Sequence, residues 1–523
     1  MSAWLTLEAL SVQAQGRDGS AQRLLGPIDL QLQAGQCLGV VGESGSGKSL
    51  TALSLLGLLP PPLRAQGRLC VDAAPIELAG AAHARLRGRG LAWVPQDPLA
   101  SLHPLRRVGA QLVETLRAVC GLGAAAAQAQ ALALIERVQL PDPADALRRY
   151  PHQFSGGQRQ RIAIALALAT QPRALIADEP TSALDARIAR DILDLLDRLR
   201  REDGLSLLLI SHDLPLVGAY AQQLLVLKRG EAVERGATAA LFAAPAQAYT
   251  RELLAADKIA PLPESESAPA SEPALLSGEG LRMRYPRAPR PALDGVDIQL
   301  HRGEGLALVG ESGSGKSTLG RALLRLLRGA QGRVRLDGVD LASLDAAALR
   351  KLRARTGVVF QDPYASLDPR LRIAEIVAEP LRIHGQGDAA SRRARAGELL
   401  RAVGLDADML DRYPHQFSGG QRQRIAIARA LATQPQLLVC DEAVSALDAH
   451  HRAAILALLV QLKRERGLAL LFVTHDLAAA AAVAERIAVL EAGRIVETGP
   501  TARVLRAPAH PHTRALLAAR PAV

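Results

Sequence analysis

The sequence predicts an α/β protein built from two tandem P-loop modules. The motif VGESGSGKS at residues 41–49 recurs at 309–317. The block RYPHQFSGGQRQRIAIA occurs at 149–165 and again at 412–428, in the same order and at nearly the same spacing. Repetition on this scale indicates a duplicated domain and not an array of short repeats. Apolar residues make up 49% of the chain, enough for several hydrophobic cores.

Strands and helices are expected to alternate within each copy. Short β-like runs come first, and then an apolar strand leads into a Gly-rich loop and a helix that begins near Lys48 or Lys316. A long Ala/Leu/Arg stretch follows that is helical by propensity, and two further apolar strands come last. The predicted strands lie at residues 7–12, 28–32, 37–41, 174–177 and 207–210 in the first copy, and at 296–300, 306–309, 437–440 and 470–473 in the second. This alternation predicts a parallel sheet in each module.

Composition indicates where the two modules begin and end and which partners and cellular compartments fit the chain. The first module is expected at 1–255 and the second at 276–523, and the Pro-, Ser- and Glu-rich segment 256–275 between them reads as a flexible linker. The net charge of +11 is compatible with a solvated surface, nucleic acid or an anionic membrane, but 2% aromatic residues argue against base-stacking platforms. The four Cys lack metal-knuckle spacing, and a disulfide framework is implausible in so long a chain, which favours a reducing cytosol. We see no signal peptide and no run of about 18 apolar residues, so action at a membrane would require partners.

The Gly-rich loops carry the pattern Gly-x4-Gly-Lys-Ser, which is typical of phosphate binding. Backbone N–H groups and the following helix N-terminus attract phosphates, the Lys reaches the outer phosphates, and the Ser hydroxyl ligates Mg²⁺. A chance Gly-rich turn does not explain two occurrences, each between a predicted strand and a predicted helix. The predicted nucleotide-binding residues are Gly42, Glu43, Ser44, Gly45, Ser46, Gly47, Lys48 and Ser49 in the first copy, and Gly310, Glu311, Ser312, Gly313, Ser314, Gly315, Lys316, Ser317 and Thr318 in the second.

An apolar strand that ends in Asp-Glu follows each P-loop, at Asp178-Glu179 and Asp441-Glu442. The Asp can hold Mg²⁺ through water, and the Glu can polarise the attacking water. Such an ending is weak evidence alone and becomes strong behind a P-loop. A Ser-Gly-Gly-Gln sequence also heads a helix in each copy, where it offers a hydroxyl and backbone donors to a terminal phosphate. These residues are Ser155, Gly156, Gly157 and Gln158, and Ser418, Gly419, Gly420 and Gln421.

Together these motifs resemble an ABC transporter ATPase with both nucleotide-binding domains fused in one chain. The resemblance covers nearly all of the chain apart from the linker. It implies ATP and Mg²⁺ as cofactors, ATP hydrolysis as the activity, and domains with a RecA-like core, an antiparallel β subdomain and an α-helical subdomain. It also implies intramolecular pairing, in which the Ser-Gly-Gly-Gln sequence of one domain closes over the ATP held by the P-loop of the other.

The resemblance assigns further roles. Gln96 and Gln361 match the loop that touches Mg²⁺ and senses the permease, and Asp185 and Asp448 match the loop that links the two sites. Catalysis falls to Glu179, Glu442 and two histidines that match the γ-phosphate switch, His212 and His475. The implied Mg²⁺ contacts are Ser49, Gln96, Asp178, Ser317, Gln361 and Asp441.

Further motifs narrow the resemblance to the peptide and nickel importer group, and to fused chains of the microcin C and oligopeptide type. They are QDPLASLHP, QDPYASLDP and the tails AYTRELL and HPHTRALL. The group implies uptake of short peptides or peptide-like compounds, with two integral-membrane permease subunits and an extracytoplasmic solute-binding protein. It implies a peripheral position on the cytoplasmic face of the inner membrane and no nucleic acid. His510 and His512 fall in the tail motif, so we do not expect a metal site there. The cargo stays open among oligopeptides, dipeptides, glutathione, nickel and microcin-type antibiotics.

The two copies differ at three places. Tyr285 fits the aromatic position that stacks on adenine, whereas Ala14 aligns there in the first copy, so the Lys48 site is expected to bind adenine less tightly. Leu166 stands opposite Arg429, and Ala443 opposite Pro180, and we attach no function to either difference. Both sites keep the Lys, Glu, His and opposing Ser-Gly-Gly-Gln, so we predict two hydrolytic sites.

Two other function classes remain as alternatives. A tandem ABC ATPase acting on the ribosome would fit the charge, but such chains carry a long charged helical linker. A DNA-repair ABC ATPase carries zinc modules, which four scattered Cys cannot supply.

Overall fold

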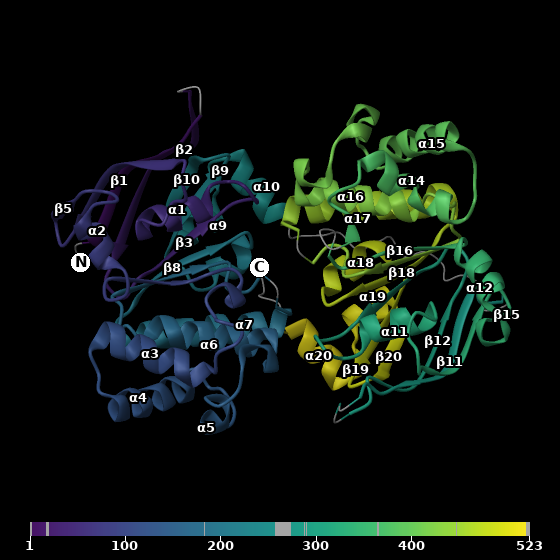
Figure 1. The fold of residues 1–523 in the computed structure, drawn as a ribbon, viewed down its shortest axis with the longest axis horizontal. Coiled ribbons are helices and arrows are strands. Elements are labelled where there is room, and N and C mark those ends of the chain that lie inside the picture. The colour runs from purple at the N-terminus through teal and green to yellow at the C-terminus, as the bar shows by residue number, and fades with distance from the viewer. Residues whose placement is uncertain are drawn as a thin grey trace. The chain divides into compact units, whose positions relative to one another are not determined.

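The computed structural model describes residues 3–16, 20–182, 184–256, 273–286, 288, 290–362, 366–445 and 447–518. The chain divides into two compact units, whose described residues lie within 3–256 and within 273–518 (Figure 1). Most of the predicted linker lies outside the described residues. At its ends, Ala256 is the last residue of helix α10, and Leu275 is buried in a hydrophobic core.

Each unit contains two sheets and two groups of helices. The strands of the first unit are β1 (Ala3–Gln15), β2 (Ala21–Gln33), β3 (Cys37–Val41), β4 (Leu63–Val71), β5 (Ala74–Ile76), β6 (Leu91–Val94), β7 (Ala174–Asp178), β8 (Ser206–Ser211), β9 (Gln223–Lys228) and β10 (Glu231–Ala237). Its helices are α1 (Lys48–Leu56), α2 (Ala81–Leu86), α3 (Val108–Cys120), α4 (Ala124–Arg137), α5 (Pro143–Ala146), α6 (Gly156–Leu168), α7 (Ala186–Asp203), α8 (Leu214–Gly218), α9 (Thr238–Ala243) and α10 (Ala248–Ala256).

The second unit repeats this order. Its strands are β11 (Leu276–Met283), β12 (Leu293–Leu300), β13 (Gly305–Val309), β14 (Gln331–Leu336), β15 (Val339–Asp340), β16 (Thr356–Val359), β17 (Leu437–Asp441), β18 (Ala469–Thr474), β19 (Arg486–Glu491) and β20 (Arg494–Pro500). Its helices are α11 (Lys316–Leu323), α12 (Ala346–Arg353), α14 (Ile373–Ile383), α15 (Ala389–Ala402), α16 (Gly419–Ala430), α17 (Ala449–Arg466), α18 (Leu477–Val483), α19 (Thr501–Arg506) and α20 (Pro511–Ala518).

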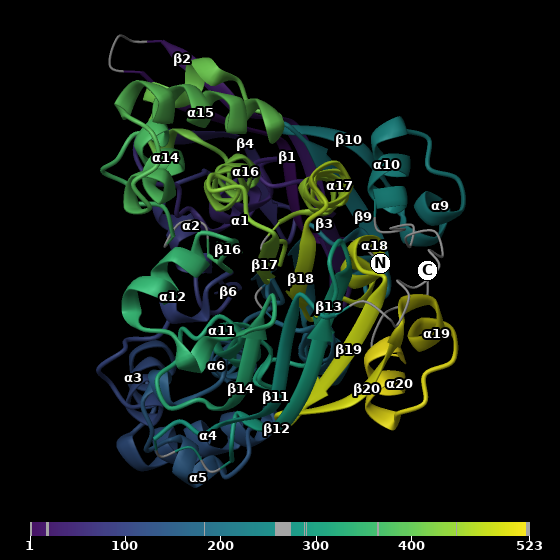
Figure 2. The same cartoon turned by 90° about the vertical axis from the view of Figure 1, so that its right-hand side faces the viewer.

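The central sheet of each unit has six strands. In the first unit the order is β10-β9-β3-β8-β7-β6, and in the second it is β20-β19-β13-β18-β17-β16 (Figure 2). Neighbouring strands pair in parallel except at the β9–β10 and β19–β20 edges, which are antiparallel. A separate antiparallel sheet has the order β2-β1-β4-β5 in the first unit and β12-β11-β14-β15 in the second. The predicted parallel core and the implied antiparallel β subdomain are therefore both confirmed.

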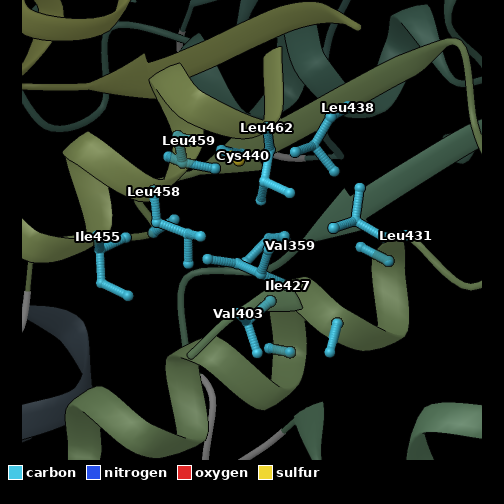
Figure 3. Close-up of a cluster of buried hydrophobic side chains, with 14 of the residues drawn as sticks. Val359, Val403, Ile427, Leu431, Leu438, Cys440, Ile455, Leu458, Leu459 and Leu462 are labelled. Atoms are coloured by element: carbon cyan, nitrogen blue, oxygen red, sulfur yellow. The ribbon is translucent and has the colours of Figure 1, made fainter. Parts of the chain in front are cut away.

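The central sheet separates two hydrophobic cores, because successive side chains of a strand point to opposite faces. In β17, Leu438 and Cys440 face the core shared with α14–α17, whereas Leu437 and Val439 face the core shared with α11 and the antiparallel sheet. Figure 3 shows the first of these cores, where helix α16 contributes Ile427. Burying each such side chain stabilises the fold by about 2 kcal/mol, so both layers are held to the sheet that carries the functional loops.

Helices α3–α6 form the α-helical subdomain of the first unit and lie together in Figure 1, away from strands β1, β2 and β5. Helices α14–α16 take the same place in the second unit (Figure 2). No single described helix is long and apolar enough to cross a membrane; α3 and α4 reach that length and composition only when taken together, and they are bent by 118°. The four cysteines are free, and three of them are buried.

Candidate functional site

Each P-loop connects the centre of the six-stranded sheet to a helix. Strand β3 is buried along its whole length and β13 occupies the same place in the second unit. The last loop residues, Gly47 and Gly315, have φ of 103° and 107°, a left-handed conformation that favours glycine. Neither α1 nor α11 has a side-chain cap or an acidic residue in its first turn. The helix N-termini thus present backbone N–H groups and positive potential toward the loop, as anion binding requires.

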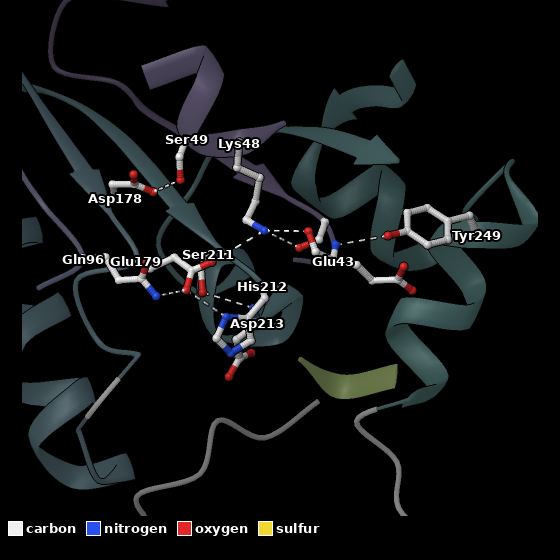
Figure 4. Close-up of polar contacts among 11 residues, drawn as sticks. Glu43, Lys48, Ser49, Gln96, Asp178, Glu179, Ser211, His212, Asp213 and Tyr249 are labelled. Carbon is white, nitrogen blue, oxygen red and sulfur yellow. Dashed lines mark hydrogen bonds and ion pairs between the residues drawn. The ribbon is translucent and has the colours of Figure 1, made fainter. Parts of the chain in front are cut away.

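The P-loop lysines are buried at the mouth of each loop. Lys48 is 4% exposed, and its Nζ donates to the carbonyl oxygens of Gly42 at 2.8 Å and Glu43 at 2.9 Å (Figure 4). Lys316 makes the same contacts with its own loop, both at 2.8 Å. An ammonium group held this way carries its charge where a phosphate chain would lie between the loop and the helix.

A serine and an aspartate meet next to each lysine. Ser49 Oγ donates to Asp178 Oδ1 at 3.3 Å, and Ser317 Oγ donates to Asp441 Oδ1 at 2.8 Å. Burial raises the pKa of Asp178 above its ordinary value, and the hydrogen bond from Ser49 partly opposes this. A buried carboxylate beside a hydroxyl is an oxygen donor set that suits Mg²⁺.

The glutamate after each aspartate is the centre of a polar cluster (Figure 4). In the first unit Glu179 Oε2 accepts from Gln96 Nε2 at 3.2 Å and lies 3.3 Å from His212 Nδ1, while Oε1 lies 3.5 Å from Lys48 Nζ. Burial alone would raise the pKa of Glu179, but the hydrogen bond to His212 and the nearby charges of His212 and Lys48 lower it overall. The carboxylate is therefore ionised at neutral pH and able to accept a proton from water.

The second unit has the same cluster with a longer histidine contact. Gln361 Nε2 donates to Glu442 Oε2 at 2.9 Å, and His475 Nδ1 lies 3.9 Å from the same oxygen. Both glutamates adopt a positive φ, 46° at Glu179 and 49° at Glu442. The backbone N–H of Glu179 is held by the carbonyl of Ile210, and that of Glu442 by the carbonyl of Val473. Such strain in a non-glycine residue is typical of functional sites.

The Ser-Gly-Gly-Gln sequences form the first turns of α6 and α16. Ser155 Oγ accepts from Gln158 N at 3.3 Å, and Gln158 Oε1 accepts from Ser155 N at 3.0 Å. The second unit has the same capping box between Ser418 and Gln421. A Cβ at Gly157 would lie 2.5 Å from the Ile188 side chain, because this turn packs against the start of α7.

Asp185 and Asp448, expected in the loop that links the two sites, each make a local contact in the structure. Asp185 caps α7 by accepting from Ile188 N at 3.0 Å, and Asp448 caps α17 in the same way. These contacts connect each Ser-Gly-Gly-Gln turn to the loop after Glu179 or Glu442 of its own unit. Pairing of each turn with the opposite P-loop stays a prediction.

The P-loops fit a nucleotide better than they fit a bare metal ion. Ser46 Oγ and Ser314 Oγ are buried within the loops and have no hydrogen-bond partner among the described residues. No group of three or more His, Cys, Asp and Glu in the described part of the chain could hold a metal ion. Mg²⁺ would therefore need phosphate oxygens in addition to the Ser-Asp pair, which is the usual way that proteins bind it.

Sequence reasoning missed one contact to the P-loop. The backbone N–H of Glu43 donates to the hydroxyl of Tyr249 on α10 at 3.2 Å (Figure 4), and Lys228 Nζ lies 4.1 Å from the centre of the Tyr249 ring. The signal was present in the tail AYTRELL, which served only to recognise a family group. The tail helix thus contacts the nucleotide loop of its own unit.

Sequence reasoning also missed a difference between the two P-loops. Thr318 follows the Lys-Ser pair in the second unit, and its Oγ1 lies 3.3 Å from the Tyr285 hydroxyl. Leu50 takes that position in the first unit, so the hydroxyl is missing there. Ala14 lies within β1 and pairs with Gln22, whereas β11 ends at Met283, before Tyr285. A direct comparison of GKSL with GKST would have revealed the difference between Leu50 and Thr318.

Comparison with known proteins now decides the family. A family model described as ABC transporter matches residues 25–182 and 293–445, and one described as the C-terminal region of oligopeptide/dipeptide transporters matches residues 496–523. The glutathione import ATP-binding protein of Salmonella paratyphi A is 44% identical, over 94% of this chain and 86% of its own. The chain belongs to the ABC transporter ATP-binding family. The Escherichia coli K12 protein of the same description is 42% identical over the same shares of both chains.

A solved dimeric bacterial ABC transporter cassette is 34% identical and covers 43% of this chain and 98% of its own, with a TM-score of 0.40. Because the ABC transporter model matches twice, this member of the family carries two ATP-binding cassettes in one chain. The chain is an ATPase subunit, and its C-terminal end is that of the oligopeptide/dipeptide transporters.

Proposed function

We propose that this ABC ATPase powers the import of short peptides or peptide-like compounds, with glutathione as the first candidate. The observation that carries the proposal is the similarity to glutathione import ATP-binding proteins along 94% of the chain. The oligopeptide/dipeptide transporter match at residues 496–523 supports the same class of cargo. Glutathione is itself a tripeptide, so it falls within the cargo class that the sequence motifs indicated.

The chemistry that the geometry supports is hydrolysis of ATP by an activated water. Glu179 or Glu442 takes a proton from the water as it attacks the γ-phosphorus, and the bond from the γ-phosphorus to the oxygen of ADP breaks. Bound Mg²⁺ would neutralise charge on the phosphates, and Ser49 with Asp178, or Ser317 with Asp441, would hold it together with Gln96 or Gln361. The lysines and the P-loop N–H groups hold the phosphate chain in line with the glutamate.

The partners proposed are two permease subunits in the inner membrane and an extracytoplasmic solute-binding protein. The chain would lie on the cytoplasmic face of that membrane as a peripheral subunit. ATP bound between the two cassettes would draw them together, and hydrolysis would release them. Each Gln96 or Gln361 side chain that contacts a catalytic glutamate would report this cycle to the permeases.

Uptake by cells tests the proposal directly. Cells that carry the Glu179→Gln/Glu442→Gln double variant are compared with wild-type cells for uptake of labelled glutathione, di- and oligopeptides, and nickel. Loss of glutathione or peptide uptake is expected. Loss of nickel uptake alone would contradict the proposed peptide cargo but would leave the proposal of an importer ATPase standing. Unchanged uptake of every solute, with altered growth and polysome profiles, would favour the ribosomal alternative.

A further inference from the structure

Glu43 is the residue at which the tail of the first unit meets the P-loop. Its backbone N–H donates to the Tyr249 hydroxyl at 3.2 Å, and its carbonyl oxygen accepts from Lys48 Nζ at 2.9 Å (Figure 4). A phosphate that bound Lys48 Nζ would compete with this carbonyl for the lysine, but it would leave the Tyr249 contact in place. Tyr249 is therefore able to hold this part of the loop both before and after a nucleotide binds.

The Tyr249 side chain is itself held in place. It is 5% exposed and belongs to the hydrophobic core that α3–α7 share with the central sheet. Lys228 Nζ lies 4.1 Å from the centre of the ring, a cation–π contact that favours one ring position. Glu234 fixes the start of α10 by accepting from the N–H groups of Ala246 and Gln247. The hydroxyl is thus presented to the P-loop by a side chain with little remaining freedom, which lowers the entropy cost of the contact.

The second unit has a different pair of residues at these two positions. Alignment of the repeated tails places His512 opposite Tyr249 and Glu491 opposite Lys228. His512 Nδ1 lies 3.3 Å from Glu491 Oε1, and the histidine side chain is 9% exposed. Its Nε2 atom is buried and has no hydrogen-bond partner among the described residues. An aromatic ring beside a cation in the first unit is therefore replaced by an imidazole beside a carboxylate.

The two tails are otherwise attached in the same way. Glu497 on β20 accepts from the N–H groups of Ala509 and His510, as Glu234 does from its own tail. Both P-loop lysines also donate to two carbonyl oxygens of their own loops. Within the part of the chain that the structure describes, the exchange of the Tyr–Lys pair for the His–Glu pair is therefore a local difference between two similar tails.

We propose that Tyr249 is a positioning residue for the P-loop of the first unit. Its hydroxyl fixes the backbone at Glu43, so that the loop is already arranged when the phosphate chain arrives and less ordering remains to be done on binding. Lys228 holds the ring in position for this contact. His512 and Glu491 give the second P-loop no such support. The inference rests on the proposed role of the P-loops in holding ATP.

Removal of the hydroxyl alone tests the proposal. Tyr249→Phe keeps the ring in the core and loses only the contact to the loop. In a Lys316→Ala background, which leaves the first site to be measured, a fluorescent ATP analogue should bind Tyr249→Phe about threefold to tenfold more weakly, the effect of one hydrogen bond. The matched control is Tyr220→Phe, which removes a hydroxyl that donates to Asp194 at 2.7 Å and should leave the affinity unchanged.

Two further measurements separate a role in the P-loop from general packing. Inorganic tripolyphosphate, which has no adenine, should compete for the site with the same loss of affinity in Tyr249→Phe, because Glu43 belongs to the phosphate-binding loop. Hydrogen exchange of the segment 42–47, measured without nucleotide, should become faster in Tyr249→Phe and stay unchanged in Tyr220→Phe. A hydroxyl that served only packing in the core would leave both quantities at their wild-type values when removed.

The second unit offers the reverse experiment. In a Lys48→Ala background, His512→Tyr/Glu491→Lys gives the second tail the pair found in the first, and it should tighten binding of the ATP analogue by about threefold. The control is His512→Phe/Glu491→Lys, which supplies the ring without the hydroxyl and should bind the analogue no more tightly than Lys48→Ala alone.

Three results would overturn the proposal: unchanged affinity in Tyr249→Phe, an equal loss in Tyr220→Phe, or a loss for the ATP analogue without a loss for tripolyphosphate. The last would assign Tyr249 to the adenine end of the nucleotide. No gain in His512→Tyr/Glu491→Lys would overturn the assignment of the difference between the units to this pair. Each of these outcomes leaves the ATP-binding role of the P-loops standing. That role would fail instead if Lys48→Ala/Lys316→Ala bound the analogue as tightly as the wild type.

Discussion

At the scale of single residues, Glu179 and Glu442, the proposed catalytic bases, decide how many sites are expected to hydrolyse ATP. Each contacts a glutamine and lies near a histidine, and both have a lowered pKa. We expect Glu179→Gln and Glu442→Gln each to remove hydrolysis at its own site, so that turnover falls by about half or more, and the double variant to fall by about 100-fold. Phosphate release from the purified chain measures this.

The control is Glu252→Gln, which changes an exposed glutamate on α10 and should leave turnover unchanged. A silent Glu179→Gln or a silent Glu442→Gln would contradict the prediction of two hydrolytic sites.

The predicted adenine contact is the other difference between the two units at this scale. The second unit has Tyr285 with its hydroxyl near Thr318, and the first has Ala14 and Leu50 at those positions. Because a lost aromatic stack costs about 1 kcal/mol, we expect the Lys316 site to bind ATP at least about fivefold more tightly than the Lys48 site. A fluorescent ATP analogue, titrated into Lys48→Ala and Lys316→Ala variants, measures one site at a time.

Tyr285→Ala is the matched variant for this difference and should bring the second site to the affinity of the first. Equal affinities in the two lysine variants would show that Tyr285 does not stack on adenine.

At the scale of elements, the tail of the first unit is held by one glutamate. Glu234 on β10 accepts from the N–H groups of Ala246 and Gln247 and from the Thr250 hydroxyl, and α10 then brings Tyr249 to the P-loop. Burial raises the pKa of Glu234, but these hydrogen bonds lower it overall. Its contribution to stability is therefore present above the ordinary pKa of 4.5 and is lost as the pH falls through the lowered pKa.

We expect hydrogen exchange at Ala246 and Gln247 to be slow at pH 5 and above, after correction for intrinsic rates, and to lose protection at lower pH. Glu234→Gln should weaken this protection and remove its pH dependence. Glu231→Gln, on the same strand and with its carboxylate 3.5 Å from the exposed Arg23, is the control. Equal pH dependence in Glu234→Gln would mean that another group holds the tail.

Most core elements could be predicted from local pattern. The strand at 37–41 was predicted with its observed limits, and those at 174–177 and 437–440 each extend by one residue, to the aspartate. Strands β9, β10, β19 and β20 were not predicted, and of these β10 and β20 are edge strands. Strands β10 and β20 lie on the border of a sheet with their polar residues toward solvent, so they lack the continuous apolar run that marks a central strand.

At the scale of the whole molecule, the pairing of the two cassettes is the main prediction. It places Ser418 at the Lys48 site and Ser155 at the Lys316 site. Glu179→Gln/Ser418→Arg should then damage one site twice and keep the turnover of Glu179→Gln alone. Glu179→Gln/Ser155→Arg should damage both sites and fall by about 100-fold.

Phosphate release measures both double variants, and the mirror pair on Glu442 serves as the internal control. If both double variants lost turnover equally, each Ser-Gly-Gly-Gln turn would not belong to the opposite site.

The sequence by itself determined the duplication, the P-loops, the Asp-Glu strands and the Ser-Gly-Gly-Gln helix starts, because each depends on residues close together in the chain. Tertiary structure decided which of these meet. Glu179 contacts Gln96 across 83 residues and His212 across 33, and Tyr249 reaches the P-loop across 206. Such contacts follow from the order of strands in the sheet, which spacing along the chain does not specify.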